Sequence, residues 1–182
     1  MLAQPEAVHL PYTVSHRNVK HPRLEFRTGT LLVVLPHGQD EKRVLNKHRQ
    51  WIDRKYQFIH DVIDTSATLT LESRTREELR ALVKESIKKY SEELGCAPDH
   101  LFIKKMCTKW ASCSRKGNLT INSLGQYLPD DLVEYVVFHE MVHLINPNHD
   151  QQFWKCIRKK FNNTSEIEKS LCTYWFRIQK VS

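Results

Sequence analysis

The chain contains, at residues 136–149, the segment VVFHEMVHLINPNH. Within this segment, His139, Glu140 and His143 follow the pattern H-E-x-x-H. Residues four apart lie on one face of a helix, so both imidazoles are expected to bind one metal ion. Glu140 lies about 100° around the same helix, where its carboxylate is expected to reach a metal-bound water without being a ligand. The segment therefore predicts a buried helix that carries two metal ligands and a general base.

The same segment predicts where this helix ends and which residue follows it. Proline disfavours helical geometry in the residue before it, so Asn146-Pro147 is expected to stop the helix. The chain is then expected to turn back and bring His149 to the same ion, as in the spacing H-E-x-x-H-x-x-x-x-x-H. We therefore predict one zinc ion per chain, held by His139, His143 and His149.

A later helix offers an alternative third ligand. Many enzymes with H-E-x-x-H take a glutamate from such a helix, and Glu166 or Glu168 is suitably positioned in the sequence. Each glutamate also has a structural interpretation. Glu168 has capping-box spacing from Ser165, and Glu166 suits the first turn of a helix through the helix dipole. His149 is the preferred ligand, and the two glutamates stay open as alternatives.

These residues predict hydrolytic chemistry. Three neutral imidazoles leave zinc a fourth position for a water whose pKa falls to about 7, and Glu140 is expected to take its proton. The prediction is a zinc-dependent metallopeptidase, with Glu140 as the catalytic residue. One alternative is a metal-dependent nucleotide phosphohydrolase of the nucleoside triphosphate pyrophosphatase type. The chain has only five glycines and no phosphate-binding loop, which argues against this alternative. Another is a non-enzymatic zinc-containing binding module, in which Glu140 would have no use.

Composition describes an ordinary globular protein. At 182 residues the chain suits one compact domain with a small appended lobe, and 40% hydrophobic with 27% charged residues is usual. Five cysteines without a C-x-x-C pair predict reduced, packed thiols and a cytoplasmic protein rather than a second zinc site. No apolar run reaches the roughly 18 residues that a membrane span needs, and residues 1–10 lack the apolar stretch of a signal peptide.

Local patterns predict an α+β fold, with a β-rich lobe at residues 1–38 and a second region at residues 39–182. In the first half of the chain we predict strands at 24–27 and 31–35 joined by a turn at Thr28-Gly29, a helix from Asp40 to about residue 61, and a helix from Thr75 to Gly95. In the second half we predict an antiparallel strand pair at 101–110 and 118–126 across the turn 114–117. Three further helices are predicted to begin at Pro129, Asp150 and Ser165. Residues 67–71 fit either a short strand or an extended link. Strands, helices, strands and helices in this order are typical of α+β proteins.

The chain resembles the YgjP-like metallopeptidases, which are related to the SprT-like and WLM metalloproteases. The motifs that carry the resemblance are KWASCSRKGNLTIN at residues 109–122, VVFHEMVH at residues 136–143, Asn148-His149 and Phe153-Trp154. Ala111 stands where the family pattern usually has glycine. The resemblance covers most of the chain, from about residue 12 to residue 161, and it implies a zincin-like core with an N-terminal β-rich lobe.

The resemblance also implies how a protein or peptide substrate is bound. The hairpin from Trp110 to Asn122 would form a strand edge beside the cleft, and such an edge binds extended peptides by β-augmentation. Trp110, Ser112 and Asn122 are therefore predicted to bind substrate. Relatives of the SprT and WLM type cut proteins attached to DNA, and a net charge of +7 suits proximity to nucleic acid. The sequence contains no recognisable DNA-binding module, and a solvated helix face is the preferred explanation of its basic clusters.

Overall fold

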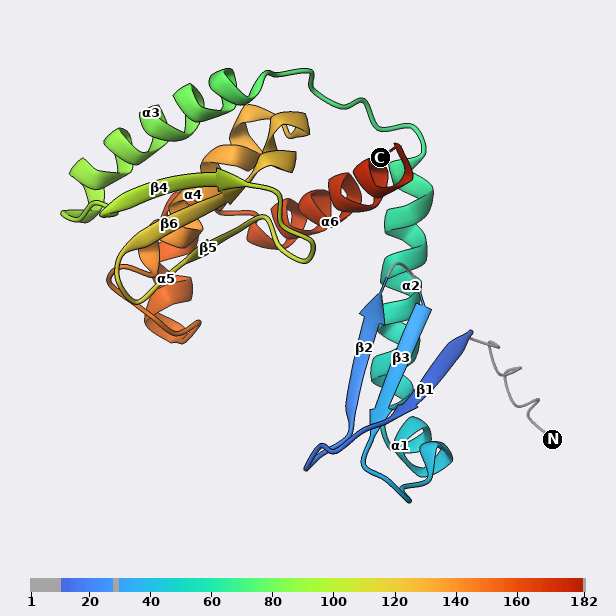
Figure 1. Ribbon diagram of the computed structural model, residues 1–182. Coiled ribbons are helices and arrows are strands. Elements are labelled where there is room, and N and C mark those ends of the chain that lie inside the picture. The colour runs from blue at the N-terminus through green and yellow to red at the C-terminus, as the bar shows by residue number, and fades with distance from the viewer. Residues whose placement is uncertain (1–10, 28–29, 182) are drawn as a thin grey trace. The chain divides into compact units, whose positions relative to one another are not determined.

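The computed structural model describes residues 11–27 and 30–181 (Figure 1). The chain divides into two compact units, Met1–Ala67 and Thr68–Ser182. The predicted boundary after residue 38 lies inside the first of these units, ahead of its two helices. Among the described residues, no helix has a stretch that is long and apolar enough to cross a membrane.

The described part of the N-terminal unit, residues 11–27 and 30–67, is a three-stranded sheet followed by two helices. Its strands are β1 (Tyr12–His16), β2 (Arg23–Arg27) and β3 (Thr30–Leu35), in the order β1-β3-β2. β2 and β3 are antiparallel, as predicted, and β1 runs parallel to β3. The predicted turn at Thr28-Gly29 lies outside the described residues. The core of this unit consists of buried residues from β3 and the helices: Leu31, Val33, Leu35, Val44 and Ile52.

The predicted helix from Asp40 to residue 61 is in fact two helices. α1 (Glu41–Lys47) begins as predicted, because Oδ1 of Asp40 accepts a hydrogen bond from the N–H of Lys42 at 2.9 Å. α2 (Arg49–Ser66) follows directly. His48 separates the two helices with φ −109° and ψ 12°, which departs from helical geometry. Residues 67–71 form neither strand nor helix.

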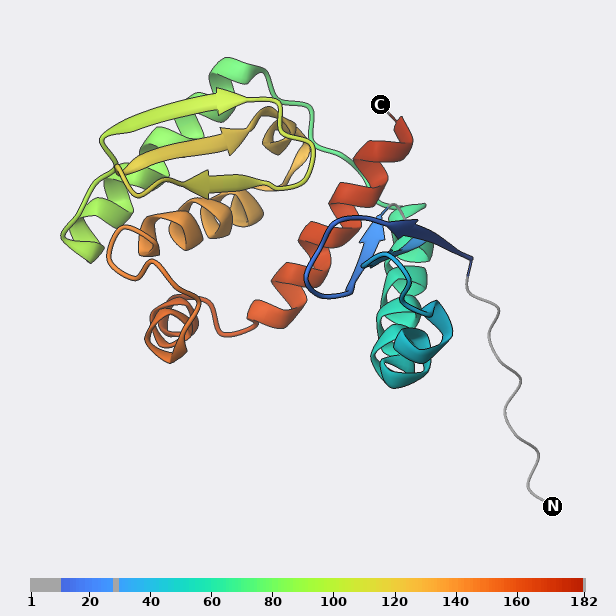
Figure 2. The same ribbon diagram turned by 60° about the horizontal axis from the view of Figure 1, so that its bottom comes forward.

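The second unit contains three short strands and four α-helices (Figures 1 and 2). In chain order its elements are α3 (Arg76–Leu94), β4 (His100–Lys104), β5 (Ala111–Cys113), β6 (Asn118–Asn122), the 3-10 helix η1 (Ser123–Tyr127), α4 (Asp130–Val142), α5 (Gln151–Lys160) and α6 (Thr164–Val181). Figure 2 shows the three strands lying across α3 and α4. Small sheets and helices in this arrangement confirm the predicted α+β class.

The prediction for the second sheet is wrong in its pairing and in the length of the strand expected at 118–126, which ends at Asn122 because η1 follows it. β6 pairs antiparallel with the three-residue strand β5, across the predicted turn in which Gly117 has φ 71°. The stretch predicted as its antiparallel partner instead contains β4, which runs parallel to β6. The sheet order is β4-β6-β5. Residues 105–110 connect β4, at one edge of the sheet, to β5, at the opposite edge. The strand that directly precedes the turn is therefore β5 and not β4.

The capping boxes and the glycine cap predicted from the sequence are present in the structure, except for the capping box predicted at the start of α6. Thr75 and Glu78 form the predicted capping box, and Gly95 ends α3 with φ 69°. The predicted capping box at Ser165 is wrong, because α6 begins at Thr164 and the carboxylate of Glu168 accepts a hydrogen bond from Tyr135 instead. A contact with a distant helix therefore replaces the local cap.

α4 is the central helix of the second unit. It contacts α3, α5, α6 and the strands β5 and β6. Its buried side chains face every neighbour: Leu132, Val133, Tyr135, Val136, Val137, Phe138, Met141 and Val142. A helix that is apolar on nearly all sides is held rigidly by its surroundings. The polar side chains near its C-terminal end are therefore fixed in place.

Candidate metal centre and active site

His139 and His143 lie one turn apart at the C-terminal end of α4. Both side chains are half-buried, and their ring centroids are 5.4 Å apart. The predicted helical spacing thus puts both imidazoles on one side of the helix. The helix ends at Val142, close to the predicted stop before Pro147.

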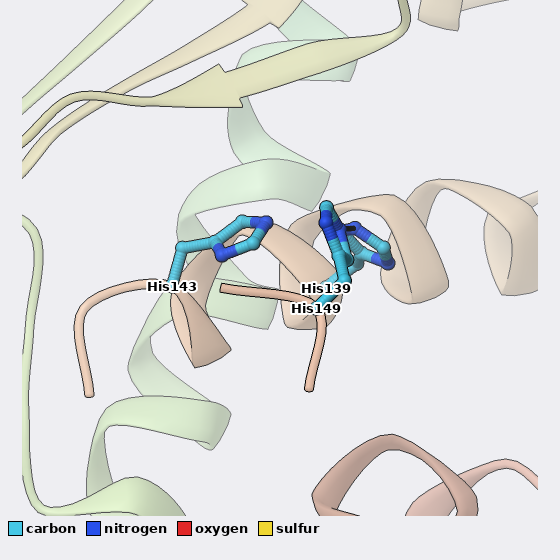
Figure 3. Close-up of side chains that lie close together, drawn as sticks. All are labelled: His139, His143 and His149. Atoms are coloured by element: carbon cyan, nitrogen blue, oxygen red, sulfur yellow. Dashed lines mark hydrogen bonds between the residues drawn. The ribbon is translucent and has the colours of Figure 1, made fainter. Parts of the chain in front are cut away.

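His149 joins these two residues from the loop beyond the helix. Its Nε2 atom lies 3.0 Å from Nε2 of His139, and the ligand atoms of all three histidines lie within 4.8 Å of one another (Figure 3). Bonds of about 2.0–2.1 Å to one tetrahedral ion put two ligand nitrogens about 3.3 Å apart. The three imidazoles therefore fit a single metal ion.

The start of α5 fixes the position of His149. Asp150 is the N-cap of α5, and its Oδ1 atom accepts hydrogen bonds from the N–H groups of Gln152 at 2.9 Å and Phe153 at 3.0 Å. His149 immediately precedes this cap. The helix start predicted at Asp150 is confirmed, and it holds the neighbouring imidazole against α4.

A backbone carbonyl orients His143. The Nδ1 atom of His143 lies 3.1 Å from the carbonyl oxygen of Asn146. A carbonyl only accepts, so this contact assigns the proton to Nδ1 and leaves a lone pair on Nε2. Nε2 is then the atom available to a metal, and the contact is of the kind that orients metal-binding histidines in proteins.

Phe153 forms an apolar support beneath all three histidines. Its ring is fully buried and stacks on His143 with centroids 4.7 Å apart and an interplanar angle of 27°. It meets His139 and His149 edge-on, at centroid distances of 4.9 Å and 4.6 Å. The sequence contains Phe153 within a family motif, but only the packing reveals this role.

The surroundings favour neutral imidazoles. Burial, followed by the charges of His143 and His149, lowers the pKa of His139 to about 4. Burial and the charge of His143 also lower the pKa of His149, although Glu168 opposes the shift. Neutral imidazoles are the form that binds metals, so the site is suited to a cation near neutral pH.

Glu140 faces the main pocket, a cavity of about 690 Å³ that His143 and His149 also line. Burial raises the pKa of Glu140, while the charge of His143, a hydrogen bond from the backbone N–H of Cys113 and the charge of Lys109 partly offset this effect. A carboxylate with a raised pKa beside a metal site is suited to accept and return a proton.

The three predicted substrate-binding residues lie in different surroundings. Ser112 lines the main pocket, and Trp110 lines a second, smaller cavity of about 240 Å³, the side pocket. Asn122 lines neither pocket and is fully buried. Its Oδ1 atom accepts from the N–H groups of Met106 and Leu124, and its Nδ2 atom donates to the carbonyl oxygens of Met106 and Lys109. The Asn122 side chain therefore supports the segment before β5 and cannot reach a ligand.

The two alternative glutamates are not part of the histidine group. Glu166 is exposed, and its carboxylate accepts a hydrogen bond from Asn163 at 3.3 Å. Glu168 lines the side pocket next to His139, where it accepts from the hydroxyl of Tyr135 at 3.3 Å. Of the three candidates for a third ligand, His149 is the one that the structure brings to His139 and His143.

Three imidazoles around one point, with a carboxylate beside them, define a candidate metal-dependent active site. The chain matches the model of the YgjP-like metallopeptidase domain over residues 64–174, and it belongs to this family. This match confirms the resemblance drawn from the sequence.

Two solved structures are similar to part of the chain. One is the metallopeptidase zymogen of Pyrococcus abyssi abylysin, with 25% identity, a TM-score of 0.47, and coverage of 50% of this chain and 92% of that chain. The other is the metallopeptidase zymogen of Methanocaldococcus jannaschii jannalysin, with 26% identity, a TM-score of 0.44, and coverage of 57% and 97%. Comparison with curated proteins gives no match.

Proposed function

We propose that this chain is a zinc-dependent peptidase in which His139, His143 and His149 hold the ion and Glu140 is the general base. The proposal depends on one observation above all, the 3.0 Å approach of the Nε2 atoms of His139 and His149, with His143 in the same group. Membership of a metallopeptidase family supports the same reaction class.

The set of donors suits zinc. Catalytic zinc sites have three protein ligands and one position for water or substrate, and imidazole is among the preferred ligands. The lowered pKa values of His139 and His149 favour the neutral, metal-binding form at neutral pH. When bound, zinc supplies a Lewis acid that lowers the pKa of a water to about 7 and polarises a peptide carbonyl.

Glu140 is suited to move the proton in this reaction. The N–H of Cys113 donates to its carboxylate, which orients the group, and burial raises its pKa toward the working range of a general base. Glu140 takes a proton from the attacking water and delivers it to the nitrogen of the leaving amine. The water and the scissile carbonyl would lie in the main pocket, which Glu140 lines.

The edge of β5 supports an extended peptide as the substrate. The N–H of Asn122 donates to the carbonyl of Trp110 at 2.7 Å, and the N–H of Ser114 donates to the carbonyl of Asn118 at 2.9 Å. These hydrogen bonds turn Trp110 and Ser114 toward β6, so strand alternation turns the backbone groups of Ala111 away from β6. No further strand lies on that side of β5 among the described residues. Ala111 is only 6% exposed but lines both pockets, and we propose that a peptide entering them pairs with its backbone.

The test is hydrolysis by the zinc-loaded protein with matched variants. An unfolded protein substrate is incubated with the wild type, with Glu140→Gln and with Glu92→Gln, which makes the same change at an exposed site on α3. Parallel reactions contain double-stranded DNA or replace the protein substrate with nucleoside triphosphates. Zinc content is measured by mass spectrometry in every sample.

We expect about one zinc per chain in all three proteins. Peptide-bond cleavage by the wild type and Glu92→Gln, and a loss of at least about a hundredfold in Glu140→Gln, would support the proposal. Full activity in Glu140→Gln would exclude this residue as the base. Hydrolysis of nucleoside triphosphates without cleavage of protein would support the phosphohydrolase alternative instead. Stimulation by DNA would support the predicted proximity to nucleic acid.

A further inference from the structure

The side pocket adjoins the proposed catalytic residues from the direction of α6. It shares Lys109, Ala111 and Glu140 with the main pocket, and His139 also lines it. The two cavities therefore meet at the general base. A peptide bond held beside Glu140 would have one neighbouring side chain close to each cavity.

The walls of the side pocket are mainly apolar. Trp110, Tyr135, Val136 and Leu171 contribute to them, and the last three belong to the buried core. The ring of Trp110 is held edge-on by Trp175, with centroids 5.0 Å apart. Such walls bind the methylene groups of a side chain and exclude water from them. The volume of about 240 Å³ is sufficient for a long side chain.

Glu168 places a carboxylate among these apolar walls. Its Oε1 atom accepts a hydrogen bond from the hydroxyl of Tyr135 at 3.3 Å, and Tyr135 is itself only 2% exposed. Among the described residues, Glu168 forms no ion pair with a lysine or arginine, so its carboxylate can accept further hydrogen bonds. A cationic group is the partner that such a carboxylate favours.

Lys109 lines both pockets but does not neutralise this carboxylate. No ion pair joins Lys109 to Glu168, and the charge of Lys109 instead lowers the pKa of Glu140. Lys109 therefore lies where the two cavities meet, and Glu168 belongs to the side pocket alone. The side pocket combines apolar walls with one carboxylate from α6.

The direction of a bound peptide determines which of its side chains enters the side pocket. Antiparallel pairing is the commoner arrangement of neighbouring strands, and a peptide paired in this way runs from Cys113 toward Ala111. Cys113 and Ser112 line the main pocket, Ala111 lines both pockets, and Trp110 lines the side pocket alone. The residue that follows the cleaved bond therefore lies beside the side pocket.

We propose that the side pocket, through Glu168, selects a lysine or arginine side chain immediately after the cleaved bond. The methylene groups lie along Trp110 and Leu171, and the cationic end meets the carboxylate. This inference rests on the proposed peptidase function and names the substrate class of the same site. Glu168 acts here as a specificity-determining residue and not as a metal ligand.

The experiment begins with a library of peptides that the zinc-loaded wild type is allowed to cleave. Mass spectrometry of the products identifies the residue after each cleaved bond. One cleaved peptide is then made with lysine, arginine, glutamate or the neutral analogue norleucine at that position. The four peptides are compared in the wild type, Glu168→Gln, Glu168→Lys and the control Glu92→Gln, which makes the same change at another exposed glutamate.

In the wild type and Glu92→Gln, we expect kcat/KM for lysine and arginine to exceed that for norleucine by about fivefold, the effect of one partly exposed ion pair. Glu168→Gln should remove this preference, so that within this variant kcat/KM for the lysine and arginine peptides equals that for the norleucine peptide. Glu168→Lys should instead favour the glutamate peptide. A preference for lysine that survives in Glu168→Gln, or a wild type without that preference, would overturn the proposal. Loss of zinc from Glu168→Gln would also overturn it, because it would identify a metal ligand.

Failure of the peptidase function itself would be recognised separately. If the wild type cleaves no peptide, binding of fluorescent lysine and norleucine peptides to the zinc-loaded protein is measured by anisotropy. If the lysine peptide binds more tightly and this difference disappears in Glu168→Gln, the proposed selectivity of the side pocket would be supported even though the proposed peptidase function is wrong. Equal binding of the two peptides, or no binding, would overturn the proposed selectivity of the side pocket as well.

Discussion

The ring of Phe153 stacks on the imidazole of His143, with centroids 4.7 Å apart and planes inclined by 27°. The two residues belong to different helices, since His143 is the C-cap of α4 and Phe153 lies in the first turn of α5. The same aromatic ring contacts His139 and His149 edge-on. One buried phenylalanine thus supports all three candidate metal ligands.

Replacing Phe153 by leucine should weaken both the fold and the metal site. The smaller side chain leaves a cavity, and we expect the free energy of unfolding to fall by about 1–2 kcal/mol. A phenylalanine-to-alanine change would lower it by about 3–5 kcal/mol. Without the ring beneath them, the imidazoles are held less firmly, and zinc affinity should fall by about tenfold. Urea denaturation of the metal-free protein and zinc titration against a competing chelator measure the two effects.

The control for this prediction is Phe102→Leu. Phe102 is 48% exposed on β4 and should change neither quantity. A zinc affinity that remains at the wild-type value in Phe153→Leu, together with a loss of stability, would show that the ring contributes to packing only.

Removal of one imidazole should abolish zinc-dependent stabilisation. Zinc at a hundred times its dissociation constant should stabilise the wild type by about 2.7 kcal/mol, because it binds the folded state. His143→Ala should lose bound zinc and this stabilisation, and a chelator should have the same effect on the wild type. His100→Ala, at an exposed position of β4, should behave like the wild type. Thermal unfolding with and without zinc measures the difference, and a His143→Ala variant that keeps one zinc per chain would exclude His143 as a ligand.

Asn122→Asp should loosen the segment that precedes β5. The aspartate carboxylate cannot donate to the carbonyl oxygens of Met106 and Lys109, and its charge is buried. We expect a loss of stability of about 3 kcal/mol and faster hydrogen exchange at the amide of Met106. Asn162→Asp is the control, since Asn162 is exposed. Unchanged exchange at Met106 would mean that Asn122 does not hold this segment.

The stability of the fold should depend on pH through Glu134. Burial alone would raise the pKa of Glu134, but hydrogen bonds from Lys89 and Tyr90, each 2.8 Å long, outweigh burial and lower it. A carboxyl whose pKa is lower in the folded state stabilises the fold above its unfolded pKa of about 4.5. This contribution is lost as the pH falls through the lower, folded value.

Urea denaturation between pH 3 and pH 7 tests this expectation in the wild type and in Glu134→Gln. The variant should be less stable near pH 7 by on the order of 1 kcal/mol, and its stability should fall less steeply below pH 4.5. Glu92→Gln should follow the wild type throughout. Parallel curves for the wild type and Glu134→Gln would contradict a role of Glu134 in the acid response.

Local sequence patterns were sufficient to predict most of the helices and to predict that His139 and His143 lie on one face of a helix. The distance from His139 to His143 is set by the helix repeat, and the capping box at Thr75 involves residues three apart in the chain. Such features depend on neighbours along the chain. For this reason they could be predicted without knowledge of the rest of the fold.

Features that depend on distant partners could not be predicted in this way. Alternation identifies Leu101 and Leu119 as strand residues, but it does not reveal that their strands pair in parallel. Glu168 has a local partner in Ser165 by spacing, yet it contacts Tyr135, which lies 33 positions away. The role of Asn122 likewise depends on a segment that crosses the sheet.

Asn146 connects the end of α4 to the candidate metal site through its own peptide groups. Its N–H donates to the carbonyl of Val142 at 2.8 Å, and its carbonyl accepts from Nδ1 of His143 at 3.1 Å. Fraying of this last turn would remove the acceptor that fixes the His143 tautomer, and an ion on the opposite ring nitrogen would oppose such fraying. Metal binding and the integrity of the helix terminus are therefore expected to be cooperative, and each should protect the other.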